Sequence, residues 1–251
     1  MAFYINKQTK IKDSYQFDSV ENNLNKSHTL SPTVVGSSVI ALVYDQGVII
    51  GTDTICSYYS SLKFTNVQRV EKLTDNCVYT ATGEFADFQE VVRLTQEMTN
   101  QTFLNDDNIS YTPQDYAHYI SQLQYHYRNK MNPIYLWSVI GGFYQGKPYL
   151  AQVDPYGTYL ERKQVSTGFG GYLSGALIDN NWNPQSNLEQ AKQVIQKCFE
   201  SLYYRDTKAH DVIQITIVDK DGIKMEKPHR IQSKWNYQGF VERANEKIHT
   251  Q

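Results

Sequence analysis

The sequence predicts an α+β protein with four layers, in which two stacked antiparallel sheets lie between two layers of helices. Three observations lead to this prediction. Strand-like and helix-like segments come in separate blocks, in the order strands, helices, strands, helices, strands. This order differs from the strict strand–helix alternation of a doubly wound parallel sheet. Residues 38–44 and 137–143 are apolar at most positions, which is typical of strands covered on both faces.

The first block begins after a polar segment. Residues 1–36 are mixed in charge and show no sustained periodicity, so we interpret them as a leader or flexible arm. Order is expected from Ser37 onward, with two strand pairs that each surround a short turn. The strands are expected over 37–44, 48–52, 67–73 and 77–82, with a polar, aromatic loop over 56–65.

Two helices are expected next. In the first, from Glu84 onward, apolar residues recur with a period of about 3.6 residues. The second begins with Thr112 as N-cap, Pro113 at the first helical position and Asp115 as the acid at the third position. It ends before Pro133, because the residue that precedes a proline avoids the helical conformation.

The rest of the chain supplies a second sheet, a glycine turn, two helices and a closing strand pair. These elements are expected as strands over 136–144, 148–153 and 158–163, a tight turn at Gly168, Gly170 and Gly171, helices over 172–179 and 187–204, and strands over 212–218 and 223–226. The chain is therefore divided into an arm (1–36), one αββα domain (37–233) and a polar tail (234–251).

The composition excludes several classes of function. A formal net charge of -2 provides no electrostatic footprint for nucleic acid or an anionic membrane. No apolar run approaches the roughly 20 residues that a membrane span needs. Cys56, Cys77 and Cys198 are odd in number and widely spaced, which favours small core residues in a reducing compartment over disulfides or a metal site. We expect no cofactor.

Two further patterns have simpler structural explanations than ligand binding. The glycines at 168–171 lack the Lys-Ser/Thr of a phosphate-binding loop, so they indicate a backbone turn. His118 and His126 are eight residues apart on the second predicted helix, without a cysteine or a third histidine near them. Metal ligation is therefore not expected there.

The strand order and the segment at 47–53 (GVIIGTD) together resemble the N-terminal-nucleophile hydrolases of the proteasome beta family. The resemblance extends from about residue 33 to residue 235. Within that family, four further segments are most similar to the non-catalytic seventh beta subunit of the eukaryotic core particle. They are 35–40 (VGSSVI), 128–133 (RNKMNP), 166–170 (STGFG) and 202–206 (LYYRD). The family fold that this implies is the same αββα sandwich.

The resemblance also implies a set of site positions. In this family the nucleophile is the hydroxyl of an N-terminal threonine, which is exposed when a leader is cut after a glycine, and the free α-amine acts as its base. A lysine, two aspartates and two serines complete the site. The resemblance places the leader glycine on Gly36, the nucleophile on Ser37, the lysine on Arg69, the aspartates on Asp53 and Asp206, and the serines on Phe169 and Ala209.

These positions predict an inactive centre. A guanidinium cannot release its proton near neutral pH, and it is larger than an ammonium and aimed differently. Because the residues of a catalytic unit fail together, we predict no self-cleavage after Gly36 and no peptidase activity. Asp53 and Asp206 are then expected to be structural acids that pair with Arg69 or Arg205, or cap backbone amides; a catalytic remnant is the other interpretation.

The function that the resemblance implies is that of a non-catalytic structural beta subunit of the proteasome core particle. Such a subunit contributes to ring assembly and to the chamber walls in ubiquitin-dependent protein degradation, in cytoplasm and nucleus. Two alternatives stay open: an active N-terminal-nucleophile protease subunit that uses Ser37, and a lone amidohydrolase of the same fold. The replacements at Arg69, Phe169 and Ala209 favour the first interpretation.

The partners implied by the resemblance are other beta subunits of the same and the opposite ring, and subunits of the alpha ring. Unlike neighbours must be recognised specifically, so distinctive surfaces are expected. The candidate surfaces are the arm, the loops at 100–111 and 180–186, and the tail, with Trp235, Tyr237 and Phe240 as its aromatic anchors.

Overall fold

The structure is a computed structural model that describes residues 32–104, 110–235 and 238–239. The strands are β1 (Val34–Gly36), β2 (Val39–Tyr44), β3 (Gly47–Asp53), β4 (Cys56–Tyr58), β5 (Ser61–Phe64), β6 (Val70–Thr74), β7 (Cys77–Glu84), β8 (Leu136–Tyr144), β9 (Lys147–Val153), β10 (Tyr159–Glu161), β11 (Gln164–Ser166), β12 (Val212–Asp219), β13 (Gly222–Met225) and β14 (His229–Arg230). The helices are α1 (Phe85–Leu104), α2 (Pro113–Asn129), α3 (Gly170–Leu173), α4 (Gly175–Asn181) and α5 (Leu188–Arg205).

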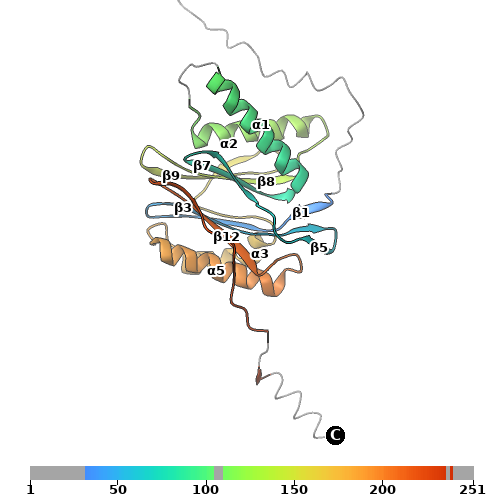
Figure 1. Ribbon diagram of the computed structural model, residues 1–251, viewed down its shortest axis with the longest axis vertical. Helices are drawn as coiled ribbons and strands as arrows, with labels where there is room; N and C mark the ends of the chain where they lie inside the picture. Colours follow the sequence, from blue (N-terminus) through green and yellow to red (C-terminus); the bar gives the residue numbers. More distant parts are fainter. Residues whose placement is uncertain (1–31, 105–109, 236–237, 240–251) are drawn as a thin grey trace, which may run out of the picture.

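These elements form four layers. Within the described residues, the strands make one antiparallel sheet of eight strands and another of six. Helices α1 and α2 lie on the outer face of the eight-stranded sheet, while α5, with α3 beside it, lies on the outer face of the six-stranded sheet (Figure 1). The predicted αββα sandwich is therefore confirmed.

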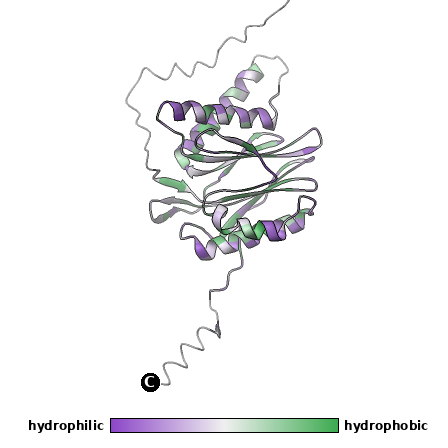
Figure 2. Ribbon diagram, turned by 180° about the vertical axis from the view of Figure 1, so that it is seen from behind, coloured by the Kyte–Doolittle hydropathy of each residue, from purple (hydrophilic) through white to green (hydrophobic). Residues whose placement is uncertain are grey.

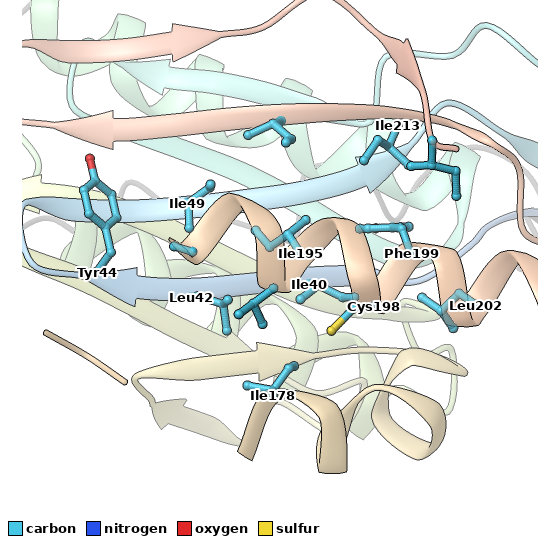
Figure 3. Packing of buried hydrophobic residues seen from close by; sticks show 14 of the residues in the cluster. Ile40, Leu42, Tyr44, Ile49, Ile178, Ile195, Cys198, Phe199, Leu202 and Ile213 are labelled. Atoms are coloured by element: carbon cyan, nitrogen blue, oxygen red, sulfur yellow. The ribbon is translucent and has the colours of Figure 1, made fainter. Parts of the chain in front are cut away.

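Period-two alternation explains why β2 is apolar on both faces. Val39 and Ala41 belong to a cluster between the two sheets, whereas Ile40 and Leu42 belong to a second cluster beneath α5. Figure 3 shows these second-cluster residues facing α5, whose Ile195 and Phe199 reach down to the strands. A third cluster fills the space between α1, α2 and the eight-stranded sheet. Each pair of adjacent layers thus has its own apolar filling.

The hydropathy of the ribbon agrees with this layering. In Figure 2 the outer helices carry long hydrophilic stretches, while much of the strand layers is hydrophobic. No helix among the described residues is long and apolar enough to cross a membrane. The short strand β1 also appears as a hydrophobic arrow at the side of the molecule.

The helices α2 and α5 begin close to the positions predicted from the sequence, and both begin with side-chain caps. The N-cap Thr112 accepts a hydrogen bond from the Asp115 amide, and the Asp115 carboxylate accepts one from the Thr112 amide, so the predicted start is confirmed. Helix α5 begins in the same way, with Asn187 and Gln190 as the reciprocal pair.

The division of strands between the sheets differs from the sequence expectation. The hairpin β2–β3 lies in the same sheet as β12, and β3 pairs with β12 along its whole length, from Asp53 to Gly47. The hairpin β6–β7 lies with β8–β9 in the other sheet. The expectation that residues 136–163 begin a second sheet is wrong, because hairpin signals define local pairs and leave open which pairs become neighbours. The strand expected over 158–163 is found as the shorter β10, which pairs with β9, and the strand β11 that follows it pairs with β2 in the other sheet.

Two segments that were expected to lack strands form them. Residues Val34–Gly36 were assigned to the arm, yet β1 pairs with β4 on one side and β7 on the other. Residues 56–65 were assigned to a loop, yet they form the hairpin β4–β5. Both are too short for a periodic signal, and β1 depends on partners that are distant in the sequence. The arm up to residue 31, and the predicted tail anchors Tyr237 and Phe240, lie outside the described residues.

Candidate functional site

Three predicted site residues meet at the edge where β1 ends. Ser37 lies between β1 and β2, Asp53 is the last residue of β3, and Arg69 lies immediately before β6. Asp53 and Arg69 are buried, whereas Ser37 is partly buried. The hairpin β2–β3 brings Asp53 beside Ser37, and the β6–β7 pair carries Arg69 into the gap between the two sheets.

The guanidinium of Arg69 is fixed by several acceptors. Its Nη1 donates to Asp53 Oδ1 at 2.6 Å, in an ion pair whose two side chains are 2% and 0% exposed. Its Nη2 donates to the Ala81 carbonyl at 3.2 Å and to the Ser37 carbonyl. Breaking one side of a buried pair costs about 3–5 kcal/mol because an uncompensated charge is left. Arg69 therefore holds the strands together and has no proton to exchange.

The hydroxyl of Ser37 is engaged on both sides. It donates to Asp53 Oδ2 and accepts from Arg69 Nη1 at 3.3 Å. While the peptide bond between Gly36 and Ser37 is intact, the nitrogen of Ser37 is an amide; only cleavage after Gly36 would make it the amine base of the family mechanism. No lysine nitrogen among the described residues is hydrogen-bonded to Ser37.

The pKa of the Asp53 carboxyl is subject to opposing effects. Burial raises the pKa of the Asp53 carboxyl, because removal from water disfavours its charged form. The Arg69 guanidinium, the Ser37 hydroxyl and the Ile55 backbone amide lower that pKa, although burial prevails. The alternative that assigned Asp53 to an ion pair with Arg69 is the one that the structure shows.

Hydroxyl groups that sequence reasoning missed extend the site. Thr82 donates to the Ser37 carbonyl at 2.9 Å and shares a hydrogen bond of 2.5 Å with the Thr167 hydroxyl. Thr167 also accepts from the Val39 amide at 3.0 Å, and the Ser38 hydroxyl accepts from the Gly170 amide at 2.9 Å. These residues come from distant segments, and no sequence motif links them.

The other predicted site positions do not reach Ser37 by any hydrogen bond within the described part of the chain. Asp206 ends α5, where its carboxylate accepts from the Lys208 amide at 2.9 Å, which is a backbone cap. Phe169 is 57% exposed and lies against Tyr172, while Ala209 is buried in the apolar cluster under α5. The two expected serine positions thus offer a solvent-facing ring and a methyl group.

Strand β1 closes the space in front of Ser37. Val35 lies opposite Ser57 of β4 and Glu84 of β7, so β1 is an interior strand. The Glu84 carboxylate accepts from the amides of Thr33 at 2.6 Å and Val34 at 3.3 Å. A narrow cleft behind β1 leaves no room for a water molecule; it is lined by Gly36, Arg69, Ala81, Gly83, Phe85 and Phe88.

In the uncut chain, this arrangement binds the chain's own backbone, because β1 occupies the strand position between β4 and β7 beside Ser37. Within the described residues, no three His, Cys, Asp or Glu side chains gather as a metal site. His118 instead packs against the ring of Tyr159, with ring centroids 4.6 Å apart.

Comparison with known proteins confirms the resemblance. Residues 33–218 match the family model described as "Proteasome subunit". The chain is 35% identical over 210 residues to proteasome subunit beta type-4 of Xenopus laevis, a match that covers 83% of this chain and 87% of that protein. It is 33% identical to the beta type-4 subunit of Arabidopsis thaliana, covering 84% and 86%. It is 29% identical to proteasome subunit beta type-7 of Saccharomyces cerevisiae, covering 84% of each chain.

Proposed function

This chain belongs to the proteasome subunit family, and from that premise we propose that it is a beta subunit of the core particle that contributes structure instead of a peptidase centre. Its role is to complete the ring and the chamber wall in ubiquitin-dependent degradation. The observation that carries the proposal is Arg69, whose buried guanidinium occupies the lysine position and donates to Asp53 and to backbone carbonyls.

Two further observations support the absence of activity. Arg69 stands at the lysine position and cannot accept a proton, and a serine hydroxyl without a suitable base is a poor nucleophile. In addition, β1 pairs on both sides, so while residues 34–36 stay attached a peptide cannot add as a strand between β4 and β7. A protease that used Ser37 would need to release β1, which would break the backbone pairing of three residues and the contacts of Glu84 with the amides of Thr33 and Val34.

The test uses the endogenous complex that contains this chain. Intact-mass measurement of the chain should show an N-terminus that precedes Ser37, and an electrophilic threonine-protease inhibitor should label other subunits while leaving this chain unmodified. A mature chain that starts at Ser37 and is labelled there would refute the proposal and favour the active alternative. Native mass of the same sample separates a ring subunit from a lone amidohydrolase.

A matched pair of variants sharpens this test. Ser37→Ala removes the hydroxyl but keeps the backbone, so the peptidase activities of the complex should stay within error of the wild type. Arg69→Ala removes the ion pair with Asp53 and should lower incorporation of the chain, because a buried carboxylate loses its partner. If Ser37→Ala abolished one peptidase activity of the complex, the structural role would be wrong.

We further propose that the tail crosses to a subunit of the opposite ring. Its first described anchor, Trp235, packs edge-on against Tyr203 and Tyr204 at centroid distances of 5.5 and 5.1 Å, which fixes the exit of the tail at the end of α5. Deletion of the residues after Lys234 should then leave half-assembled particles on native gels. Full double-ring assembly at the normal rate would contradict this role.

The neighbours in the ring, the contacts with alpha subunits and a location in cytoplasm and nucleus are also part of the proposal. Cross-linking of the purified complex identifies the neighbours, and imaging of the fluorescently tagged chain tests the location. Recovery of the tagged chain without other proteasome subunits would overturn the whole assignment.

A further inference from the structure

The hairpin β4–β5 carries a group of exposed apolar and aromatic side chains on the described surface of the domain. Every residue from Tyr58 to Asn66 is exposed. Four of these are large and apolar or aromatic, with exposed fractions between 41% and 57%: Tyr58, Tyr59, Leu62 and Phe64. A contiguous group of this kind, in contrast to scattered single residues, is typical of a protein–protein contact.

The hairpin also presents a sheet edge. Strand β5 ends the order of the eight-stranded sheet, so its outer backbone groups have no strand partner among the described residues. Edge strands that carry apolar side chains pair readily with other chains unless something covers them. In the single chain, this surface is therefore uncovered and suited to a partner.

One positive charge lies against two of these rings. The Nζ of Lys63 is 5.0 Å from the ring centroid of Tyr58 and 5.6 Å from that of Phe64, which holds the ammonium over the aromatic faces. Lys63 is the sole charged residue in the sequence from 54 to 68. No described carboxylate lies within ion-pair distance of it.

We propose that the hairpin β4–β5 is a docking surface for a neighbouring, different proteasome subunit, which contacts Leu62 and Phe64 with apolar side chains and places a carboxylate against Lys63. This inference rests on the proposed function, since it needs the chain to be assembled in the core particle. The partner is identified by its chemistry: an aromatic or aliphatic patch with one Asp or Glu at its centre.

Charge disfavours two other occupants of this surface, a second copy of the chain and its own arm. A second copy that paired through β5 in antiparallel fashion would bring two Lys63 side chains together, and like charges in a cross-strand pair are destabilising. The arm of the same chain leaves the domain next to the hairpin, where the Tyr59 amide donates to the Thr33 carbonyl at 3.0 Å. However, residues 22–32, which directly precede Thr33 in the sequence, contain Lys26 and His28 and no acid, so they offer no carboxylate to Lys63.

The first experiment places a photo-reactive benzoylphenylalanine at position 62 of the full-length chain in the purified complex. After irradiation, we expect a cross-linked peptide from one other proteasome subunit, with an Asp or Glu within a few residues of the link. Cross-links confined to residues 1–31 of the same chain, cross-links to a second copy, or no cross-link at all would each overturn the proposal.

The second experiment reverses charges. Lys63→Glu should reduce incorporation into the complex by about tenfold or more, as expected for a close charge pair at an interface. Changing the cross-linked partner carboxylate to lysine should restore incorporation of Lys63→Glu. The matched control is Lys220→Glu, an exposed lysine in the β12–β13 turn, which should incorporate like the wild type.

The outcomes separate the docking proposal from the function on which it rests. If the wild-type chain never co-purifies with proteasome subunits, the proposed function fails. If the wild type is incorporated, while Lys63→Glu is incorporated equally and position 62 forms no link to another subunit, only the docking proposal fails.

Discussion

Substitution of Gly36 by alanine tests the packing of the site directly. A Cβ atom at position 36 would lie 2.9 Å from Nε of Arg69, 3.1 Å from Nη2 and 3.2 Å from Cζ. These atoms belong to a buried guanidinium that Asp53 holds at 2.6 Å, so it cannot move away freely. Overpacking of this kind costs about 1–3 kcal/mol.

Displacement of the guanidinium adds a second cost. A shift of a few tenths of an ångström would weaken the hydrogen bonds from Arg69 to the carbonyls of Ser37 and Ala81, and each such bond contributes about 1 kcal/mol. We therefore expect Gly36→Ala to lower the free energy of unfolding by about 2–4 kcal/mol. For a domain of this size, that loss lowers Tm by roughly 5–15 °C.

The assay is urea unfolding of the full-length chain, monitored by tryptophan fluorescence. The matched control is Gly175→Ala at the start of α4, where an added Cβ meets no atom within 4 Å. Alanine is the better helix former, so this control should be neutral or stabilised by up to about 1 kcal/mol. If Gly36→Ala were as stable as the control, the described contact between Gly36 and Arg69 would be wrong.

Three further predictions concern β1, α2 and the buried thiols. Glu84→Gln should cost about 1 kcal/mol and speed hydrogen exchange at the Thr33 amide, because an amide side chain is a weaker acceptor than a carboxylate. Thr112→Ala should cost about 1 kcal/mol in urea unfolding through loss of the N-cap of α2. Burial raises the pKa of Cys56 and of Cys198 from 9.0 to about 11, so alkylation of the folded chain at pH 8 should be roughly a hundredfold slower than in urea.

The thiols also set the direction of the pH dependence. Because their pKa values are higher in the folded state, their contribution to stability is complete below pH 9.0 and declines as pH rises toward about 11. The free energy of unfolding should therefore fall over that window. Three results would contradict these predictions. Rapid alkylation of the folded chain at pH 8 would contradict the burial of the thiols. Unchanged hydrogen exchange at the Thr33 amide in Glu84→Gln would contradict the Glu84 contact, and unchanged stability of Thr112→Ala would contradict the N-cap.

The helices and most hairpins could be predicted from local sequence. Thr112, Pro113 and Asp115 define the start of α2 because a capping box acts over three residues, and the strand over 136–144 is found where it was predicted. The grouping of hairpins into sheets could not be predicted in this way. The pairing of β3 with β12 joins residues more than 150 positions apart, and single-chain periodicity carries no information on it.

The site was predictable only in part. Ser37, Asp53 and Arg69 meet as the resemblance placed them, whereas Asp206 accepts from the Lys208 amide just beyond α5 and Phe169 faces solvent. The Thr82 hydroxyl, which donates to the Ser37 carbonyl, and the Thr167 hydroxyl, which is hydrogen-bonded to Thr82, carry no local signal because threonine is common in strands.

Because of the position of β1 in the sheet, a cut after Gly36 would also affect the structure of the eight-stranded sheet. Among the described strands, β1 alone joins β4, and through it β5, to β7 and the rest of the eight-stranded sheet. A cut after Gly36 would thus free a nucleophile and also release the support of an exposed aromatic surface. In the uncut chain, β1 is therefore the strand through which the outer hairpin β4–β5 is connected to the rest of the eight-stranded sheet.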